Sequence, residues 1–168
     1  MINIIGIDPG KTGGIAVLSL DSTLISLQDM PLNAGDDISI VGLKEIIGEF
    51  TEKDKAIIEI THAMSFKDKD GKERQQSTSS MLNYGMEVGR IEGMLFMTGV
   101  KFKEVQSISW MRSMGVRGKT SGKYNGIEVA LKLFPSADIG NKNGRADALL
   151  MVEYYRRILS KGQGAIAA

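Results

Sequence analysis

The sequence predicts an α/β fold in which helices flank a mixed β-sheet. Three short apolar or alternating runs, separated by turn residues, fill the first thirty positions, which is typical of consecutive β-strands. Segments whose apolar residues recur with helical spacing then alternate with two further strand-like runs. The chain of 168 residues is long enough for one domain with a full hydrophobic core.

The first part of the chain is predicted to hold four strands and one helix. Strands at 2–7, 14–20 and 23–30 are separated by the turn sequences DPGKTG and LDS. A helix is expected at 38–50, where the apolar residues have helical spacing. The fourth strand, KAIIEI at 55–60, is so apolar that we expect it at the centre of the sheet, between helices on both faces.

In the second part, residues 61–75 carry alternating charges around Asp70-Gly71 and are predicted to form an exposed, mobile loop. The remaining predicted elements are a helix at 81–98, a strand at 101–105 and helices at 107–114, 125–133 and 145–159. A basic, glycine- and serine-rich loop is expected at 115–123. Residues 1–160 are predicted to form a single domain, and residues 161–168 a frayed tail.

Composition excludes several kinds of site. The chain has no cysteine and one histidine, His62, so a thiolate or histidine-rich zinc site is excluded and any metal must be held by oxygen atoms. No apolar run approaches the ~18 residues of a membrane span, and no signal peptide precedes the first strand. We therefore expect a cytoplasmic protein without a membrane partner.

The charge is unevenly distributed. Residues 1–60 hold 4 basic and 10 acidic side chains, whereas residues 61–168 hold 17 basic and 10 acidic ones. The second part therefore offers enough positive charge for a face that binds a polyanion, despite a net charge of +1 for the whole chain. An accident of composition is the alternative.

The stretch GIDPGKTGG is close to the phosphate-binding pattern G-x-x-x-x-G-K-S/T of nucleotide hydrolases. Its spacing is one residue short. The residues that follow it, IAVL at 15–18, predict a strand, whereas a phosphate-binding loop must lead into a helix. We therefore expect no nucleotide cofactor.

Three acidic residues are candidates for a metal-dependent active site. Asp8 ends the first predicted strand, Glu59 lies near the end of the fourth, and Asp147 lies at the start of the last helix. Strands one and four are expected to be neighbours, so their carboxylates would emerge at one edge of the sheet, where α/β proteins bind ligands. Converging carboxylates repel one another unless cations neutralise them, and Mg²⁺ prefers such oxygen ligands. Two such ions can activate water and stabilise the leaving oxygen of a phosphodiester.

Each of these residues also has a purely structural explanation. Asp8 suits a turn before Pro9-Gly10, and Asp147 suits the first turn of a helix. Glu59 would be costly to bury without a partner, so a salt bridge is its alternative. For His62, an ordinary hydrogen-bonded role is expected.

Several segments in the right order resemble the RuvC-type Holliday-junction resolvases, and especially the compact RuvC-like endonucleases of bacteriophages. These segments, within residues 3–157, are IGIDPGKTGGIAVL, IIEI, STSSMLNYGMEVGRIEGML, ISWMRSMGV, GKTSGK, ALKLFP and GRADALLMVEY. The resemblance implies an RNase H-like fold with a five-stranded mixed sheet. It also implies a homodimer that cuts two strands of a four-way DNA junction with Mg²⁺ or Mn²⁺, using two ions.

By this resemblance Asp8, Glu59 and Asp147 are metal ligands. The family places a fourth group, an aspartate or histidine, just before the last aspartate, and this chain has Asn143 there. An asparagine oxygen can touch a metal, but it cannot act as a base or supply charge. Three explanations stay open: three carboxylates suffice, the protein is a weak nuclease, or the chain is an inactivated form that binds junctions.

Basic segments in the second part are the candidates for DNA phosphate contacts. Phe66 is a candidate for stacking or insertion at an opened junction, with a core position as the alternative. Arg145 is a candidate for orienting the scissile phosphate or for screening the carboxylates. The predicted DNA-binding residues are Phe66, Lys67, Lys69, Lys72, Arg74, Arg112, Arg117, Lys119, Lys123 and Arg145.

Gly85, Gly89 and Gly93 recur every four residues and form one stripe on the helix predicted at 81–98. Glycine costs ~1 kcal/mol relative to alanine at each helical position, so three in register indicate a close backbone approach. Two explanations stay open: tight packing of the helix on its own sheet, or the homodimer contact that the resemblance implies.

The function predicted from these observations is metal-dependent, structure-selective cleavage of Holliday junctions and other branched DNA. The alternatives are a junction-binding form with lost catalysis and another RNase H-like nuclease that cuts RNA–DNA hybrids. Actin-like ATPases share the aspartate–glycine pattern of the first strand, but their second domain has no room in 168 residues.

Overall fold

The structure is a computed structural model, and it describes residues 2–61, 65–67, 73–75, 77–117 and 124–164. The side chains at 65–67, 73–75 and 163–164 lie outside this description. Among the described residues, none of the helices is both long and apolar enough to cross a membrane.

A five-stranded mixed sheet forms the centre of the molecule. Its strands, in spatial order, are β3 (Leu24–Asp29), β2 (Gly14–Ser19), β1 (Asn3–Asp8), β4 (Lys55–Glu59) and β7 (Lys101–Val105). The first three form the predicted antiparallel meander, and β1, β4 and β7 run parallel. This arrangement confirms the predicted fold class and the predicted pairing of the first and fourth strands.

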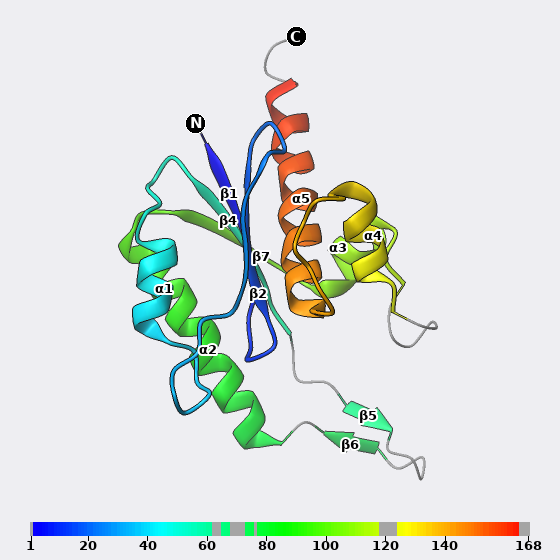
Figure 1. Ribbon diagram of the computed structural model, residues 1–168. Helices are drawn as coiled ribbons and strands as arrows, with labels where there is room; N and C mark the ends of the chain where they lie inside the picture. Colours follow the sequence, from blue (N-terminus) through cyan, green and yellow to red (C-terminus); the bar gives the residue numbers. More distant parts are fainter. Residues whose placement is uncertain (1, 62–64, 68–72, 76, 118–123, 165–168) are drawn as a thin grey trace.

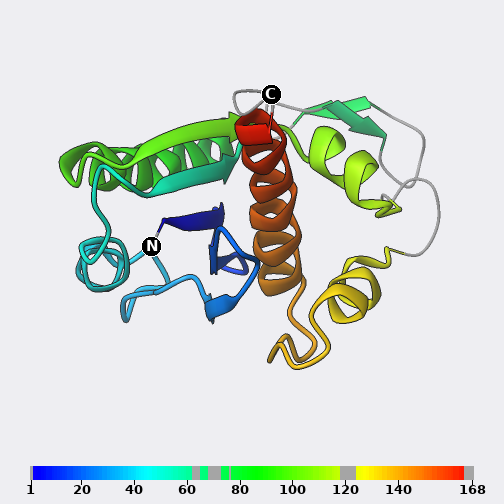
Figure 2. The ribbon, with the colours of Figure 1, turned by 90° about the horizontal axis from the view of Figure 1, so that it is seen from above.

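Helices cover both faces of this sheet (Figure 1). The helices α1 (Ile40–Ile47) and α2 (Thr78–Met97) lie on one face. The other face carries α3 (Ser107–Met114), α4 (Gly126–Leu133) and α5 (Asn143–Gly164). Figure 2 shows the same layers from above, with α5 running along the sheet.

Two helices are longer than predicted, and two are shorter, α4 by a single residue. The helix α2 begins at Thr78, three residues before its predicted start at 81. The hydroxyl of Ser77 caps it by accepting a hydrogen bond from the Ser80 amide at 3.1 Å. The last helix begins at Asn143 and continues to Gly164, past its predicted end at 159. The first helix ends at Ile47, three residues before its predicted end.

The central strands bury both faces, as the sequence of β4 predicts. Alternate side chains enter two separate cores. Ile4 and Ile57 pack with α3, α4 and α5, whereas Ile5 and Ile58 pack with α1 and α2. The sheet is therefore held from both sides, which fixes the positions of its strand ends.

Gly6 of β1 allows α5 to pack directly on the sheet. A β-carbon at this position would lie 2.4 Å from the backbone oxygen of Ala148 and 2.7 Å from the β-carbon of Val152. No side chain fits in that space. The backbones of β1 and α5 therefore touch, and this contact sets the depth of α5 on the sheet.

The prediction of an unstructured loop at 61–75 is wrong for part of this segment. The short strands β5 (Ser65–Lys67) and β6 (Glu73–Gln75) pair antiparallel, with Phe66 opposite Arg74. They lie away from the main sheet, between β4 and α2 (Figure 1). The sequence Asp70-Gly71 between them is typical of a hairpin turn. The prediction relied on the alternating charges instead and so gave a loop.

The glycine stripe of α2 does not pack on the sheet. Gly85, Gly89 and Gly93 are exposed, and a β-carbon at each would meet nothing within 4 Å among the described residues. Of the two explanations left open by the sequence, packing on the protein's own sheet is therefore wrong.

Candidate active site

The parallel pairing of β1 and β4 brings two of the predicted carboxylates to one edge of the sheet. Asp8 is the last residue of β1, and Glu59 is the last residue of β4. Because the two strands run parallel, their carboxyl ends lie side by side. This juxtaposition is the one that the sequence predicts.

A contact between glycines brings the third carboxylate to the same place. A β-carbon at Gly144 would lie 2.1 Å from the backbone oxygen of Thr12, so the start of α5 touches the β1–β2 turn. A β-carbon at Gly14 would lie 2.9 Å from the Gly144 carbonyl. The backbone approach places Asp147, near the N-terminal end of α5, beside the end of β1.

A cavity of about 770 Å³ opens at this junction. Asp8 and Asp147 line it together with Asn143, the position that the family resemblance assigns to a fourth catalytic group. The other lining residues are Lys11, Thr12, Gly13, Asp29, Met30, Leu32, Asn141, Lys142 and Gly144. Three of the four predicted catalytic residues therefore face one cavity.

Glu59 is held by a buried indole. The Trp110 side chain is 1% exposed, and its Nε1–H donates a hydrogen bond to Glu59 Oε2 at 2.7 Å. Burial raises the pKa of Glu59 to about 7, with a further rise from the negative charge of Asp147, although the Trp110 hydrogen bond lowers it. A carboxylate with this pKa in a site is typical of a functional group.

Tyr124 contacts Asp147 directly. Its hydroxyl donates a hydrogen bond to Asp147 Oδ1. The pKa of Tyr124 is raised far above its usual value, first by burial and then by the charges of Asp147, Asp8 and Glu59. All three predicted carboxylates therefore lie close enough to act on one phenol.

Tyr84 fixes the end of β4. Its hydroxyl donates to the backbone oxygen of Glu59 at 3.1 Å and accepts from the Thr61 amide at 3.0 Å. The sequence analysis missed Tyr84, Trp110 and Tyr124. The one available signal is that Trp110 is the single tryptophan of the chain.

The donor set suits a hard divalent cation. In the part of the chain that the structure describes, no three acidic or histidine side chains lie in a ready-made metal-binding group. Mg²⁺ does not require one, because it is usually held by one or two carboxylates, water molecules and substrate phosphate oxygens. The side-chain oxygen atoms of Asp8, Asn143 and Asp147 around the cavity are suitable ligands for such an ion. Its positive charge would also offset the negative charge that Asp147 places near Glu59.

The predicted DNA-binding residues are only partly described. Arg112 lies exposed on α3, and the exposed Arg117 follows that helix. The guanidinium of Arg145 donates to Asp29 Oδ1 at 2.7 Å and to the Asp138 backbone oxygen at 2.8 Å. The residues outside the described part, or with side chains outside it, are His62, Phe66, Lys67, Lys69, Lys72, Arg74, Lys119 and Lys123.

Comparison with known proteins identifies the fold. Two solved structures of RuvC from Thermus thermophilus are similar to this chain. The one in complex with a Holliday junction substrate has a TM-score of 0.64 and 14% sequence identity, over 94% of this chain and 96% of RuvC. The other has a TM-score of 0.64 and 16% identity, over 93% and 96%.

This chain has a RuvC-like fold. No protein-family model matches it, and no curated protein is similar to it in sequence. The structural match confirms the predicted RNase H-like fold, with its mixed five-stranded sheet and flanking helices. At this level of identity the likeness extends to the fold, so the roles of the individual site residues stay predictions.

Proposed function

We propose that this protein is a metal-dependent endonuclease that cuts Holliday junctions and other branched DNA. The observation that carries the proposal is the convergence of Asp8, Glu59 and Asp147 from three elements at one sheet edge. Support also comes from the fold, since the Thermus RuvC that shares it was solved with a Holliday junction substrate. A cytoplasmic location and kinship with the bacteriophage enzymes belong to the same proposal and depend on the sequence motifs.

In this proposal Asp8, Glu59 and Asp147 would hold Mg²⁺ or Mn²⁺, as a pair of ions. When bound, such ions would supply the charge that activates a water molecule and stabilises the leaving oxygen of a phosphodiester. The products of that hydrolysis would carry 5′-phosphate and 3′-hydroxyl ends.

The protein's own contribution is to orient the carboxylates. Trp110 donates to one oxygen of Glu59, and Tyr124 donates to one oxygen of Asp147. Trp110 is part of the core, and Tyr124 is partly buried against the same core just before α4. Outer-shell hydrogen bonds of this kind set the geometry of metal ligands.

The test is cleavage of a synthetic four-way junction in Mg²⁺ and in Mn²⁺, with a linear duplex and an RNA–DNA hybrid of matched sequence as competitors. Paired nicks in the junction, with little cutting of the duplex or hybrid, support the proposal. Preferential cutting of the hybrid would instead identify another RNase H-like nuclease. Junction binding without cutting in either metal would identify a junction-binding form.

The Asn143→Asp variant tests whether the fourth position limits catalysis. Asn143 lines the same cavity as Asp8 and Asp147, so an aspartate there adds an anionic oxygen ligand to the site. We expect junction cleavage to rise about tenfold at limiting Mg²⁺, since changes at and around metal ligands alter affinity by ~10–100-fold. Rates are measured in single turnover.

Asn33→Asp is the matched control, because Asn33 is exposed in the loop before α1 and does not line the cavity. We expect it to change the rate less than twofold. An Asn143→Asp rate equal to that of the parent chain would contradict the prediction and show that three carboxylates suffice.

The homodimer is also part of the proposal, with α2 as the contact. Gly85 and Gly89 line a groove of about 300 Å³ beside the ends of β4 and β7. On the same helix Leu82 is 63% exposed and Met86 is 50% exposed. Each precedes a glycine of the stripe by three residues, which puts both side chains on the glycine side. Small residues flanked by exposed apolar side chains suit the close packing of a second helix.

Met86→Glu is expected to convert a dimer into monomers, because it places a charge in an apolar contact. Sedimentation velocity at micromolar concentration measures the change. Val41→Glu on α1 is the control, since Val41 is 68% exposed on another helix and should leave the dimer intact. A monomeric parent chain, or a Met86→Glu variant that stays dimeric, would show that α2 is not the contact.

A further inference from the structure

We propose that Lys11 and Lys142 bind the DNA backbone phosphate at the active-site cavity. The inference rests on the proposed function and extends it, because neither lysine belongs to the basic segments from which DNA contacts were predicted. It assigns a second part of the DNA path to the active-site cavity itself, beside the β1–β2 turn and the start of α5.

The fold brings these two lysines together from distant parts of the chain. Lys11 lies in the β1–β2 turn, and Lys142 lies directly before α5. Both line the 770 Å³ cavity that also contains Asp8 and Asp147. The backbone contact between Gly144 and Thr12 joins their two segments, so the same packing that assembles the carboxylates also assembles the cations.

Asp29, the ion-pair partner of Lys142, does not depend on that lysine. The ammonium of Lys142 lies 3.4 Å from Asp29 Oδ2, and the lysine side chain is 61% exposed. Asp29 already accepts hydrogen bonds from Arg145 Nε at 2.7 Å and from Arg145 Nη2 at 3.3 Å. A long, exposed ion pair to a satisfied carboxylate contributes little, so Lys142 can turn to another anion.

Lys11 is carried by a well-defined turn. The Gly13 amide donates to the Gly10 oxygen at 3.0 Å, and Gly10 has a φ of +112°, which favours glycine. The Lys11 side chain is exposed and lines the same cavity. The turn therefore holds the base of this side chain in place while its ammonium can reach a ligand.

The combination of charges identifies the ligand as a phosphodiester. A DNA strand that approaches Asp8 and Asp147 meets their negative charge, and two lysines in the same cavity offset that repulsion. The cavity volume falls in the ~300–1,000 Å³ range of small-molecule sites, which suits a nucleotide unit better than a single small ion. Lysine contacts a phosphate as a point charge and reads no sequence.

The first experiment maps lysine accessibility in the unmodified chain. The protein is acetylated briefly in Ca²⁺, alone, with a four-way junction or with a mononucleotide, and each lysine is quantified by mass spectrometry. We expect at least fivefold protection of Lys11 and Lys142. Lys53 is the internal control, because it is exposed at the opposite end of the sheet, before β4 begins.

The second experiment compares the salt dependence of junction binding by the parent, the Lys11→Met/Lys142→Met double variant and Lys53→Met. Each lost phosphate contact reduces the slope of log K against log salt by about 0.9. We therefore expect the double variant to have a slope shallower by about 2 and at least tenfold weaker binding at low salt. Lys53→Met should match the parent.

The outcomes separate this inference from the proposed function. If the parent binds the junction but neither lysine is protected and the slope of the double variant is unchanged, the inference is wrong and the proposed function stands. Protection by a mononucleotide to the same extent as by the junction would identify a free-nucleotide site and overturn the inference. A parent chain that binds no DNA would overturn both.

Discussion

The Asp8→Asn variant is expected to lose junction cleavage by at least about 100-fold while it keeps its fold. Asp8 ends β1 and lines the cavity with Asp147, so its carboxylate is a proposed metal ligand in the cavity itself. Even outer-shell changes reduce metal affinity or activity by ~10–100-fold, and a ligand should matter more. Single-turnover cleavage of a labelled junction measures the effect.

The same variant should not be less stable than the parent. Carboxylates that converge without cations repel one another. Burial is the main cause of the raised pKa of Glu59, and the negative charge of Asp147 adds to it. Removing one charge relieves repulsion, so we expect an unchanged or higher unfolding temperature. Asp147→Asn should behave like Asp8→Asn, although it also alters the group that accepts the Tyr124 hydrogen bond.

Asp37→Asn is the matched control, since Asp37 is exposed in the loop before α1 and does not line the cavity. It should cleave within twofold of the parent. If Asp8→Asn also cleaves within twofold of the parent, Asp8 is not a metal ligand, and the active site proposed at this sheet edge is wrong.

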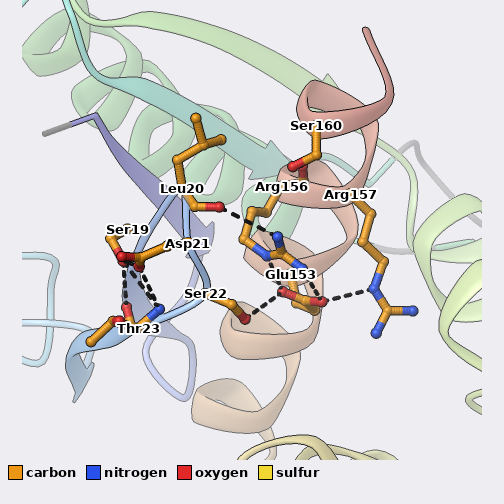
Figure 3. Close-up of polar contacts among 9 residues, drawn as sticks. All are labelled: Ser19, Leu20, Asp21, Ser22, Thr23, Glu153, Arg156, Arg157 and Ser160. Atoms are coloured by element: carbon orange, nitrogen blue, oxygen red, sulfur yellow. Dashed lines mark hydrogen bonds and ion pairs between the residues drawn. The ribbon is translucent and has the colours of Figure 1, made fainter. Parts of the chain in front are cut away.

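The Glu153→Gln variant is expected to destabilise the protein by about 3 kcal/mol. The Glu153 side chain is 4% exposed and accepts hydrogen bonds from Arg156 Nε at 2.6 Å, Arg156 Nη2 at 2.9 Å and Arg157 Nε at 2.7 Å (Figure 3). Ser22, in the turn after β2, adds a weaker contact at 3.5 Å. The strong contacts of this carboxylate therefore lie within α5, and the Ser22 contact links it to the turn after β2.

The expected loss follows from the two arginines that would remain. Removing one partner of a buried ion pair leaves an uncompensated charge and costs ~3–5 kcal/mol. The partial exposure of Arg157 places this case at the lower end. Urea unfolding monitored by circular dichroism measures the change. Glu128→Gln is the control, because the Lys132–Glu128 pair is exposed on α4. Loss of this pair should lower the free energy of unfolding by less than about 1 kcal/mol.

The same group predicts a pH dependence. Burial would raise the pKa of Glu153, but the hydrogen bonds from Arg156 and Arg157 outweigh it and hold the pKa below its ordinary value of 4.5. The stabilisation is therefore complete above about pH 4.5 and is lost as the pH falls through the lowered pKa. The stability difference between the parent and Glu153→Gln should shrink in that acidic range, and a constant difference would contradict this assignment.

Local patterns were sufficient for most of the fold. The alternation and apolar content of β1, β2 and β4 predicted the meander and the central strand. Strands that are buried on both faces consist mainly of apolar residues, so their sequences are easy to recognise. The hairpin formed by β5 and β6 was missed, since its strands are only three residues long and carry charged residues. Strands this short have almost no periodicity to detect.

Asp8 and Glu59 could be placed together from the sequence, because parallel neighbouring strands must end at the same edge. The supporting contacts could not. Trp110 donates to a residue 51 positions away, and Tyr124 donates to one 23 positions away. Such pairs depend on how α3 and α4 pack on α5, and nothing in the local sequence encodes that packing.

The sequence by itself determined which segments form strands and helices, because that depends on the periodicity of neighbouring residues. It also determined which acidic residues end strands and that position 143 lacks a carboxylate, because these depend only on residue identity. Only the tertiary structure decided that the glycines of α2 face outward and that Gly144 meets the β1–β2 turn. The same is true of the shared cavity that Lys11, Lys142 and the carboxylates line. The physical reason is that close backbone approach and charge clustering arise from packing between segments far apart in the chain.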